Sequence, residues 1–232
     1  MRNEKRNTPA WLDQVLRAGP PHSTTGTPHD ADATALADLR SAAARLARRI
    51  AAEGLADVSY TNADSPFGPL LLAATKRGLV KVAFPEQDVD DVLERLARRL
   101  SPRIVEASAP FDDARRELDE YFAGRRREFA LPLDWALVGP FGRRVLHFTA
   151  KIPYGGVSSY RQAATAAGSP RGSRAAGNAL GANPIPIVVP CHRVLRSGGA
   201  LGGYGGGIDR KRWLLGLEGA IPASSDAARS SG

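Results

Sequence analysis

The stretch SSYRQAATAAGSPRGSRAAGNALGAN (residues 158–183) joins two short helical patterns through a glycine-containing turn. The first pattern starts at a serine and stops at Gly168, and the second has Pro170 near its expected first turn. Two short helices joined in this way predict a helix-turn-helix unit. An ordinary pair of packed helices would give the same pattern, so both interpretations stay open.

The second helix of this pair is thin. Between residues 172 and 181 it consists mostly of glycine, alanine and serine, and Arg174 is its only long charged side chain. A helix that reads base edges in the wide major groove normally carries several long polar side chains. A thin helix suits close approach to a DNA backbone or a narrow groove, with Arg174 able to enter a base stack. The alternative is that the small side chains let this helix pack closely against a neighbour.

The positive charge is concentrated around this helical pair. The chain of 232 residues has a formal net charge of +8. Residues 1–150 hold 22 Lys or Arg and 21 Asp or Glu, whereas residues 151–221 hold nine basic residues and only two acids, a net of +7. A concentrated basic face suggests a polyanionic partner such as nucleic acid. A solvated basic surface is the alternative that charge alone leaves open.

The rest of the chain predicts an α+β protein. Residues 31–55 carry Leu36, Leu39, Leu46 and Ile50 at helical spacing, which predicts an amphipathic helix after a poorly ordered start. Short strand patterns fill residues 58–85, and helical patterns follow them. No apolar run approaches the ~18 residues of a membrane span, and the N-terminus lacks a signal-peptide core. We therefore expect a cytoplasmic protein.

The stretch NPIPIVVPCHRVL (residues 183–195) holds the only cysteine, Cys191. A single cysteine forms no internal disulfide and no cysteine-rich zinc site, and the four scattered histidines lack metal-ligand spacing. The proline-bounded apolar run predicts a buried strand that ends at Cys191. A thiol at the end of a rigid strand, facing a pocket, suggests a nucleophile rather than a small core residue.

A cysteine nucleophile needs a group that lowers its pKa or removes its proton. His192 is the natural base, although neighbouring residues of a strand point to opposite faces, so it would reach the sulfur through a water or after a bend. Glu218 is the candidate that orients the imidazole, since it lies in a region with few acids. The sequence does not show that the three side chains meet.

Three motifs in order carry a family resemblance: PCHRV (190–194), GGYGGG (202–207) and KRWLLGLEG (211–219). Together with the helical pair and with SPFGPLLLAAT (65–75), they resemble the methylated-DNA–protein-cysteine methyltransferases, the O6-alkylguanine-DNA alkyltransferases. The resemblance spans roughly residues 58–219.

The resemblance implies a role for several residues. Cys191 would accept the alkyl group from O6 of guanine in a single, irreversible transfer. His192 and Glu218 would form a hydrogen-bonded relay, and Asn183 would steady the site. Tyr160 would help rotate the nucleotide out of the duplex and donate a hydrogen bond to the base.

Further residues would contact DNA or the flipped base. DNA-contacting positions are Tyr160, Arg161, Ser169, Arg174 and Ser197. A loop over the base pocket would be formed by Tyr204, Gly205 and Gly206. The implied partner is double-stranded DNA containing O6-alkylguanine, with O4-alkylthymine as a further substrate. The resemblance also implies a protein without a metal or other cofactor and without a membrane partner. It implies a monomer in solution that can bind cooperatively on DNA.

The implied domains follow the motifs. Residues 1–57 form an extension that is partly disordered and contains one helix, and residues 58–134 form a ribonuclease H-like domain with a small antiparallel sheet. Residues 135–221 form a mainly helical domain with a winged helix-turn-helix-like unit, and residues 222–232 form a disordered tail.

Three other functions are compatible with parts of the sequence. An alkyltransferase-like lesion sensor carries another residue in place of the cysteine, so Cys191 argues against it. A Cys-His hydrolase needs an oxyanion hole and gives no reason for a thin basic helix. A methylation-activated transcription factor would need a second cysteine to receive a methyl group from phosphate.

Overall fold

The protein is described here by a computed structural model. The described residues are 34, 35, 38, 39, 41–43, 45, 46, 49, 50 and 53–221. Those between 34 and 50 are helical, as the amphipathic pattern predicts, but Leu36 of that pattern lies outside the described residues. The segments expected to be poorly ordered, 1–30 and 222–232, lie outside them as well. Within the described part of the chain, no helix is long and apolar enough to cross a membrane.

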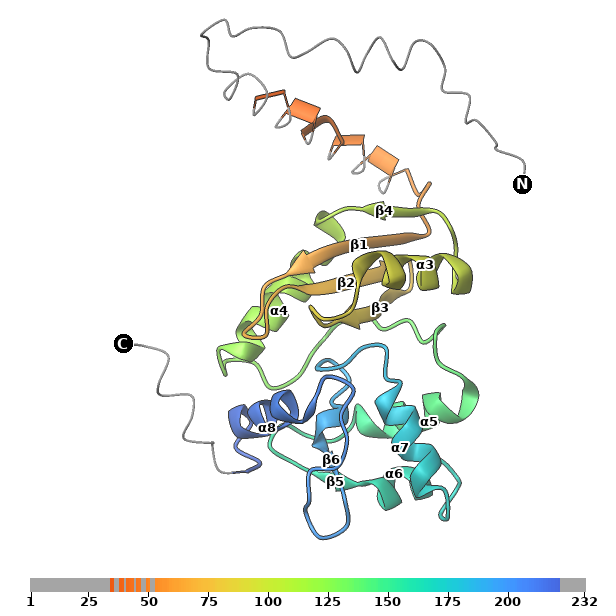
Figure 1. The fold of residues 1–232 in the computed structure, drawn as a ribbon, viewed down its shortest axis with the longest axis vertical. Coiled ribbons are helices and arrows are strands. Elements are labelled where there is room, and N and C mark those ends of the chain that lie inside the picture. Colours follow the sequence, from red (N-terminus) through yellow and green to blue (C-terminus); the bar gives the residue numbers. More distant parts are fainter. Residues whose placement is uncertain are drawn as a thin grey trace, which may run out of the picture. The chain divides into compact units, whose positions relative to one another are not determined.

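The N-terminal domain is built on a four-stranded sheet (Figure 1). Strands β1 (Val58–Ala63), β2 (Leu70–Thr75) and β3 (Gly78–Ala83) form an antiparallel meander. Strand β4 (Ile104–Glu106) lies on the other side of β1 and runs parallel to it. The sheet is therefore mixed: β1, β2 and β3 confirm the expected antiparallel arrangement, and β4 departs from it. The cause is the helical crossover between β3 and β4, which returns the chain in the direction of β1.

Helices cover both faces of this sheet. Helix α3 (Val89–Arg99) is capped by Asp88, whose carboxylate accepts from the Asp91 amide, and it buries Val92 and Leu96. A short 3₁₀ turn (Ala109–Phe111) leads into α4 (Asp112–Phe122). Because strand side chains alternate between faces, one set packs under α3 and the other packs with α4 into the main core.

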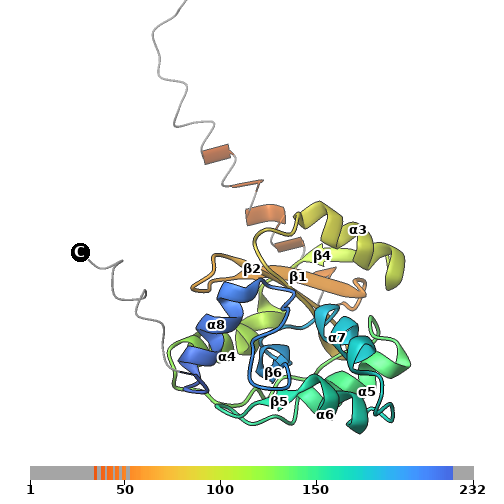
Figure 2. The ribbon, with the colours of Figure 1, turned by 60° about the horizontal axis from the view of Figure 1, so that its bottom comes forward.

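The C-terminal domain is mainly helical (Figures 1 and 2). Its helices are α5 (Pro140–Thr149), α6 (Tyr160–Ala166), α7 (Ser173–Gly181) and α8 (Ile208–Leu217). Helices α5, α6 and α7 pack against one another. A two-residue parallel pair, β5 (Ser158–Ser159) with β6 (Val194–Leu195), ties the start of α6 to the segment after the cysteine. Helices α6 and α7 are the predicted helix-turn-helix pair.

The ends of α6 and α7 follow from local chemistry. Ser159 and Gln162 form a reciprocal capping box at the start of α6. Gly168 takes a φ of 79° just after the helix, a conformation that favours glycine. The sequence predicted that Pro170 lies near the first turn of α7, but the structure places it before the helix. A separate turn, closed by a hydrogen bond from Gly172 N–H to Ser169 O at 2.8 Å, precedes α7.

The structure confirms the packing interpretation of the thin helix, and the approach to DNA stays a prediction. On the inner face, Ala176 is fully buried and Gly177 lies against the Tyr160 ring, so small residues do allow close packing. On the outer face, Arg174 and Ala175 are exposed. The hydrophobic core runs through both domains without a break, from Leu72 to the α8 side chain Leu214. This shared core holds the C-terminal domain against the sheet.

Candidate active site

The cysteine lies after a buried turn. Residues 184–190 form no strand, contrary to the sequence prediction, although their apolar side chains are buried. Three prolines in this segment lack the N–H that a ladder needs. The chain instead folds back, with Val189 N–H donating to Ile185 O at 2.9 Å and Ile187 at a φ of 75°. Cys191 then begins a 3₁₀ helix that ends at Arg193.

The amide of Asn183 fixes the sulfur. Its Nδ2 donates to Cys191 Sγ at 3.1 Å and to Val189 O at 2.9 Å, while its Oδ1 accepts from Ile185 N at 3.0 Å. All three contacts agree on one orientation of the amide, so a donor points at the thiol. Cys191 is only 5% exposed.

A cavity of about 190 Å³ opens onto Cys191. This volume lies below the ~300–1,000 Å³ of drug-sized ligand sites and suits a smaller group. Its walls come from β3 and the segment after it, the end of α7, the buried turn and the predicted loop. The lining residues are Lys81, Val82, Phe84, Gln87, Leu180, Gly181, Ala182, Asn183, Pro186, Cys191, Tyr204, Gly205 and Gly206.

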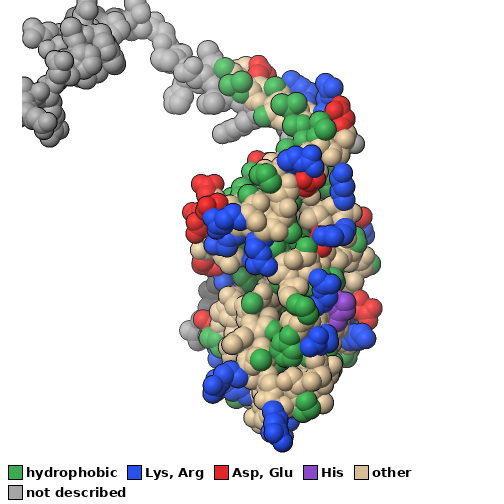
Figure 3. All heavy atoms as spheres, turned by 90° about the vertical axis from the view of Figure 1, so that its right-hand side faces the viewer, with side chains coloured by type: hydrophobic (Ala, Val, Ile, Leu, Met, Phe, Trp, Pro, Cys, Tyr) green, Lys and Arg blue, Asp and Glu red, His purple; other side chains and the backbone are tan. Residues whose placement is uncertain are grey.

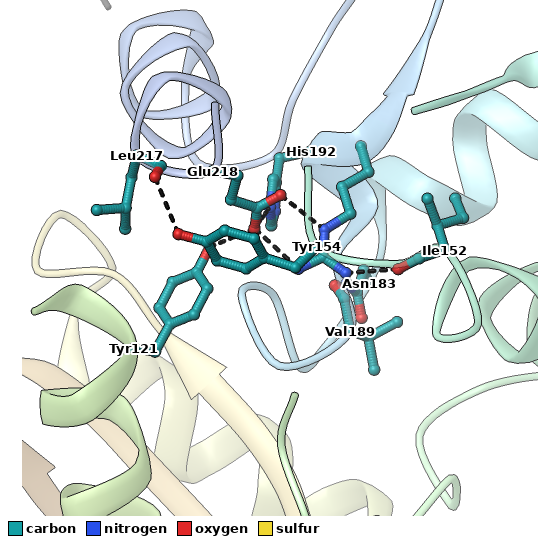
Figure 4. A network of polar contacts seen from close by, with 9 residues as sticks. Tyr121, Ile152, Tyr154, Asn183, Val189, His192, Leu217 and Glu218 are labelled. Atoms are coloured by element: carbon teal, nitrogen blue, oxygen red, sulfur yellow. Dashed lines mark hydrogen bonds and ion pairs between the residues drawn. The ribbon is translucent and has the colours of Figure 1, made fainter. Parts of the chain in front are cut away.

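A buried carboxylate at the end of α8 collects four hydrogen bonds (Figure 4). Glu218 accepts from Tyr121 Oη at 2.6 Å, and His192 Nε2 lies 2.9 Å from its Oε1. Arg193 donates to both carboxylate oxygens at 2.8 Å and also to the carbonyl of Ile152 at 2.5 Å. The imidazole and the carboxylate are both completely buried.

The protonation states follow from burial and these partners. Burial alone would raise the pKa of Glu218, but the hydrogen bonds from His192 and Arg193 lower it to about 2. Glu218 is therefore an acceptor only, and His192 Nε2 carries the proton. Burial also lowers the pKa of His192, against the opposing effect of Glu218, so the ring is neutral at pH 7 and Nδ1 is its basic nitrogen.

The thiol is protonated in this environment. Burial raises the pKa of Cys191 to about 11, although the Asn183 hydrogen bond and the Lys211 charge oppose the shift. Formation of the thiolate therefore needs a base. Within the described residues, His192 Nδ1 and Tyr204 Oη are the buried side-chain nitrogen and oxygen atoms without a hydrogen-bond partner. A basic nitrogen on the residue next to the thiol is thus free to take up a proton.

The structure brings some predicted residues together and leaves others on the surface. Cys191 and Asn183 are in contact, and His192 and Glu218 are in contact. Tyr160 is half-buried and donates to the Gly203 carbonyl at 3.1 Å rather than lining the cavity. The remaining predicted DNA-contacting residues lie outside the cavity, Ser169 partly exposed and the others exposed: Arg161, Ser169, Arg174 and Ser197.

Three site residues were not predicted. Arg193 and Tyr121 complete the shell around Glu218. Lys211 is fully buried and donates to the carbonyl of Val194 at 2.6 Å, and burial lowers its pKa to about 8 while Cys191 opposes the shift. The only sequence signal for Arg193 and Lys211 was their position inside the matching motifs, and Tyr121 had none.

The fold and the site define a class of two-domain α+β protein in which a lone thiol faces a cavity beside a helix-turn-helix pair. Residues 58–135 match the family profile described as 6-O-methylguanine DNA methyltransferase, ribonuclease-like domain. Residues 140–220 match the profile described as 6-O-methylguanine DNA methyltransferase, DNA binding domain.

Individual relatives agree with these matches. The chain is 43% identical over 162 residues to the methylated-DNA–protein-cysteine methyltransferase of Mycolicibacterium paratuberculosis, which covers 69% of this chain and 92% of the relative. The crystal structure of Mycobacterium tuberculosis O6-methylguanine methyltransferase superposes with a TM-score of 0.60 at 39% identity, covering 73% of this chain and 98% of that one. The same organism's OGT in complex with DNA gives 0.59 at 40% identity, covering 70% and 93%.

The chain therefore belongs to the methylated-DNA–protein-cysteine methyltransferase family. This confirms the resemblance drawn from the sequence motifs and the α+β fold class that it implied. Within the described residues there is no group of three or more His, Cys, Asp or Glu side chains that could hold a metal ion.

Proposed function

We propose that this protein repairs DNA by moving an alkyl group from O6 of guanine, and from O4 of thymine, onto Cys191. The observation that carries the proposal is the position of the only cysteine: it faces a cavity, with an amide donor on its sulfur and a neutral imidazole next to it. The family's function in relatives supports the same reaction.

The proposed reaction is a displacement at carbon. Sγ of Cys191 forms a bond to the alkyl carbon while the C–O6 bond breaks, and the released electron pair stays on the guanine. The thiol proton passes, through a water, to Nδ1 of His192, and the imidazolium returns this proton to the guanine anion, which leaves as the normal base. Positioning of sulfur and carbon in the cavity can contribute ~7–11 kcal/mol to such a step.

Glu218 and Asn183 act on this step without reacting. Glu218 holds the Nε2 proton of His192 and stabilises the imidazolium that forms. Asn183 stabilises the developing thiolate through its Nδ2 donor. The thioether that results has no good leaving group, so His192 and water cannot regenerate the thiol. Each protein molecule therefore acts once.

The base must leave the duplex before O6 can reach the cavity, at a cost of a few kcal/mol. In the proposal, α7 approaches the minor groove, Arg174 enters the vacated stack and Tyr160 helps turn the nucleotide. Arg161, Ser169 and Ser197 contact the backbone. The flipped base then lies under the loop Tyr204, Gly205 and Gly206.

Several finer expectations belong to the same proposal. The division into a 58–134 domain and a 135–221 domain follows the motifs, with the second domain binding DNA and reacting. We propose that the protein works as a monomer that can bind cooperatively along DNA, in the cytoplasm, without a cofactor.

One measurement tests the reaction directly. After incubation with duplex DNA containing O6-methylguanine, the intact protein is expected to gain the mass of a single methyl group, located on the Cys191 peptide. An otherwise identical duplex with guanine is the control and leaves the mass unchanged. Binding of the lesion without any gain in mass would contradict the proposal and favour a sensor.

A second prediction concerns Arg174→Ala. Stacking and cation–π contacts of an arginine are worth ~1–2 kcal/mol, so repair in duplex DNA should slow roughly tenfold. Reaction with free O6-benzylguanine needs no flipping and should keep its rate. Arg171→Ala removes the same charge from the neighbouring turn and serves as the control. An equal loss on duplex and free base would rule out a stack-filling role.

A further inference from the structure

A second cavity, of about 360 Å³, lies in the described residues next to the thiol cavity. We call it the cation pocket. It lies between α3, β3, Leu137 and the segment that follows α7. Its lining residues are Lys81, Val92, Arg95, Leu96, Arg98, Arg99, Leu137, Ala182 and Pro184. Four of these are cationic, none is acidic, and the others are apolar.

The positive charges of the cation pocket are only partly compensated. Arg98 pairs with Glu94, and Arg95 lies 3.9 Å from Asp91, but both pairs are largely exposed and worth little. Arg99 donates a hydrogen bond to the carbonyl oxygen of Leu137 at 3.2 Å, and this neutral acceptor does not balance the arginine charge. Lys81 has neither an ion pair nor a hydrogen bond among the described residues.

The protonated form of Lys81 is destabilised in the cation pocket. It is half-buried on β3, and burial together with the nearby Arg95 lowers its pKa. Two cations repel each other across this pocket, and an anion that lies between them lowers the electrostatic free energy. Arginine forks match the oxygens of a phosphate group, and a lysine adds a point charge.

The shape of the pocket indicates more than a simple ion. Its volume lies in the ~300–1,000 Å³ range of sites that hold an organic ligand. Its apolar wall, formed by Leu96, Leu137 and Pro184, can pack against a sugar, while the cations face a phosphate. A nucleotide unit has both parts.

The location connects the cation pocket to the damaged strand. Lys81 and Ala182 line both this pocket and the thiol cavity. The two cavities are also joined through the backbone, since Val82 N–H donates to Pro184 O at 2.8 Å. The face that carries these elements shows Lys and Arg side chains over both domains (Figure 3). A strand that delivers a base to Cys191 therefore has its neighbouring phosphates near Lys81.

We propose that the cation pocket binds a backbone phosphate of the DNA strand that carries the damaged base. The proposal rests on the DNA repair function proposed above and extends it, because it adds the N-terminal domain to the DNA contact surface. A free nucleotide offers the same phosphate chemistry, and the experiment separates the two sources.

The test compares two double variants of the full-length chain. Arg95→Gln with Arg99→Gln removes two charges from the cation pocket and keeps both side-chain stems, and neither residue lines the thiol cavity. Arg116→Gln with Arg125→Gln removes the same charge from exposed positions on and just after α4. The readout is the salt dependence of affinity for duplex DNA containing O6-methylguanine. Each phosphate contact contributes a slope of ~0.9 in log K against log salt.

The pocket variant is expected to lose about one unit of slope and roughly tenfold in affinity, relative to the control variant. Its rate with free O6-benzylguanine should match wild type. Equal slopes in the pocket and control variants would overturn the proposal. If the double variant fails to fold, Arg99→Gln, an exposed position, takes its place with Arg116→Gln as its control.

Two further arms distinguish the source of the phosphate and the underlying function. Titration with deoxyadenosine monophosphate and with inorganic phosphate shows whether free anions bind. Saturable nucleotide binding that the pocket variant loses, with an unchanged DNA slope, would overturn the DNA assignment in favour of a free nucleotide. A changed DNA slope in a protein that never methylates Cys191 would support the pocket and refute the repair function.

Discussion

Replacing Glu218 with glutamine is expected to lower the free energy of unfolding by about 3–5 kcal/mol. Glutamine keeps the shape of the side chain but removes the charge that balances Arg193. The Arg193 side chain is only 6% exposed and Glu218 is fully buried, so the guanidinium would remain as an uncompensated buried charge. Tyr121 would also lose its charged acceptor. Urea denaturation at pH 7 measures the change.

Glu94→Gln is the matched control for this substitution. Glu94 also pairs with an arginine, Arg98, but these side chains are 64% and 60% exposed. Its loss should change the free energy of unfolding by no more than ~0.5 kcal/mol. Similar small effects for both variants would mean that the buried Glu218–Arg193 pair does not stabilise the fold as its burial indicates.

Acid should remove the same stabilisation from the wild type. The folded-state pKa of Glu218 is lowered from 4.5 to about 2, since its hydrogen bonds from His192 and Arg193 outweigh burial. A lowered pKa means that the stabilisation is complete above pH 4.5 and is lost as the pH falls toward 2. The difference between wild type and Glu218→Gln should therefore shrink by on the order of 3 kcal/mol between pH 6 and pH 2.

Most of the secondary structure could be predicted from periodic apolar patterns and from the ordered motifs. The helices α3, α4, α5 and α6 were predictable because apolar spacing, capping residues and glycine stops agree within each segment. The order of strands in the sheet was not predictable. The partner of β4 depends on where α3 returns the chain, which is a tertiary property.

Only some of the residues around the thiol could be predicted from the sequence. Cys191, His192 and Glu218 stand out through their rarity or their position, and the structure brings the last two into contact. Their supporting shell does not stand out. Arg193 resembles any member of a basic stretch until its burial is known, and Tyr121 reaches Glu218 from 97 positions away along the chain.

The turn before the cysteine shows that a hydrophobic pattern alone does not determine the secondary structure of a short buried segment. A short apolar run is compatible with a strand, a buried helix or a buried turn, and the three prolines decided against the strand through their missing N–H groups. The consequence is functional. A turn lets Asn183 reach back to Cys191 Sγ at 3.1 Å, which residues eight positions apart on an extended strand cannot do.

Cys191→Ser is expected to abolish methyl transfer from duplex DNA while leaving affinity for the lesion within about threefold of wild type. Serine fits the same space and can still accept from Asn183 Nδ2. Its hydroxyl, however, is a far weaker nucleophile whose proton His192 cannot remove to any useful extent at pH 7. Intact mass measures transfer, and fluorescence anisotropy with a labelled duplex measures binding.

The two readouts separate chemistry from structure. A purely structural cysteine would give a serine variant that loses DNA binding and stability together, because the buried hydroxyl proton would have no acceptor and would disturb the turn. A cysteine whose role is only chemical gives a serine variant that keeps the proposed DNA-binding surface of α6 and α7, since Arg161 and Arg174 lie outside the cavity. Continued methylation of the serine variant at another residue would show that the acceptor is not Cys191, and the cavity, the relay and the single-use reaction would all need a different explanation.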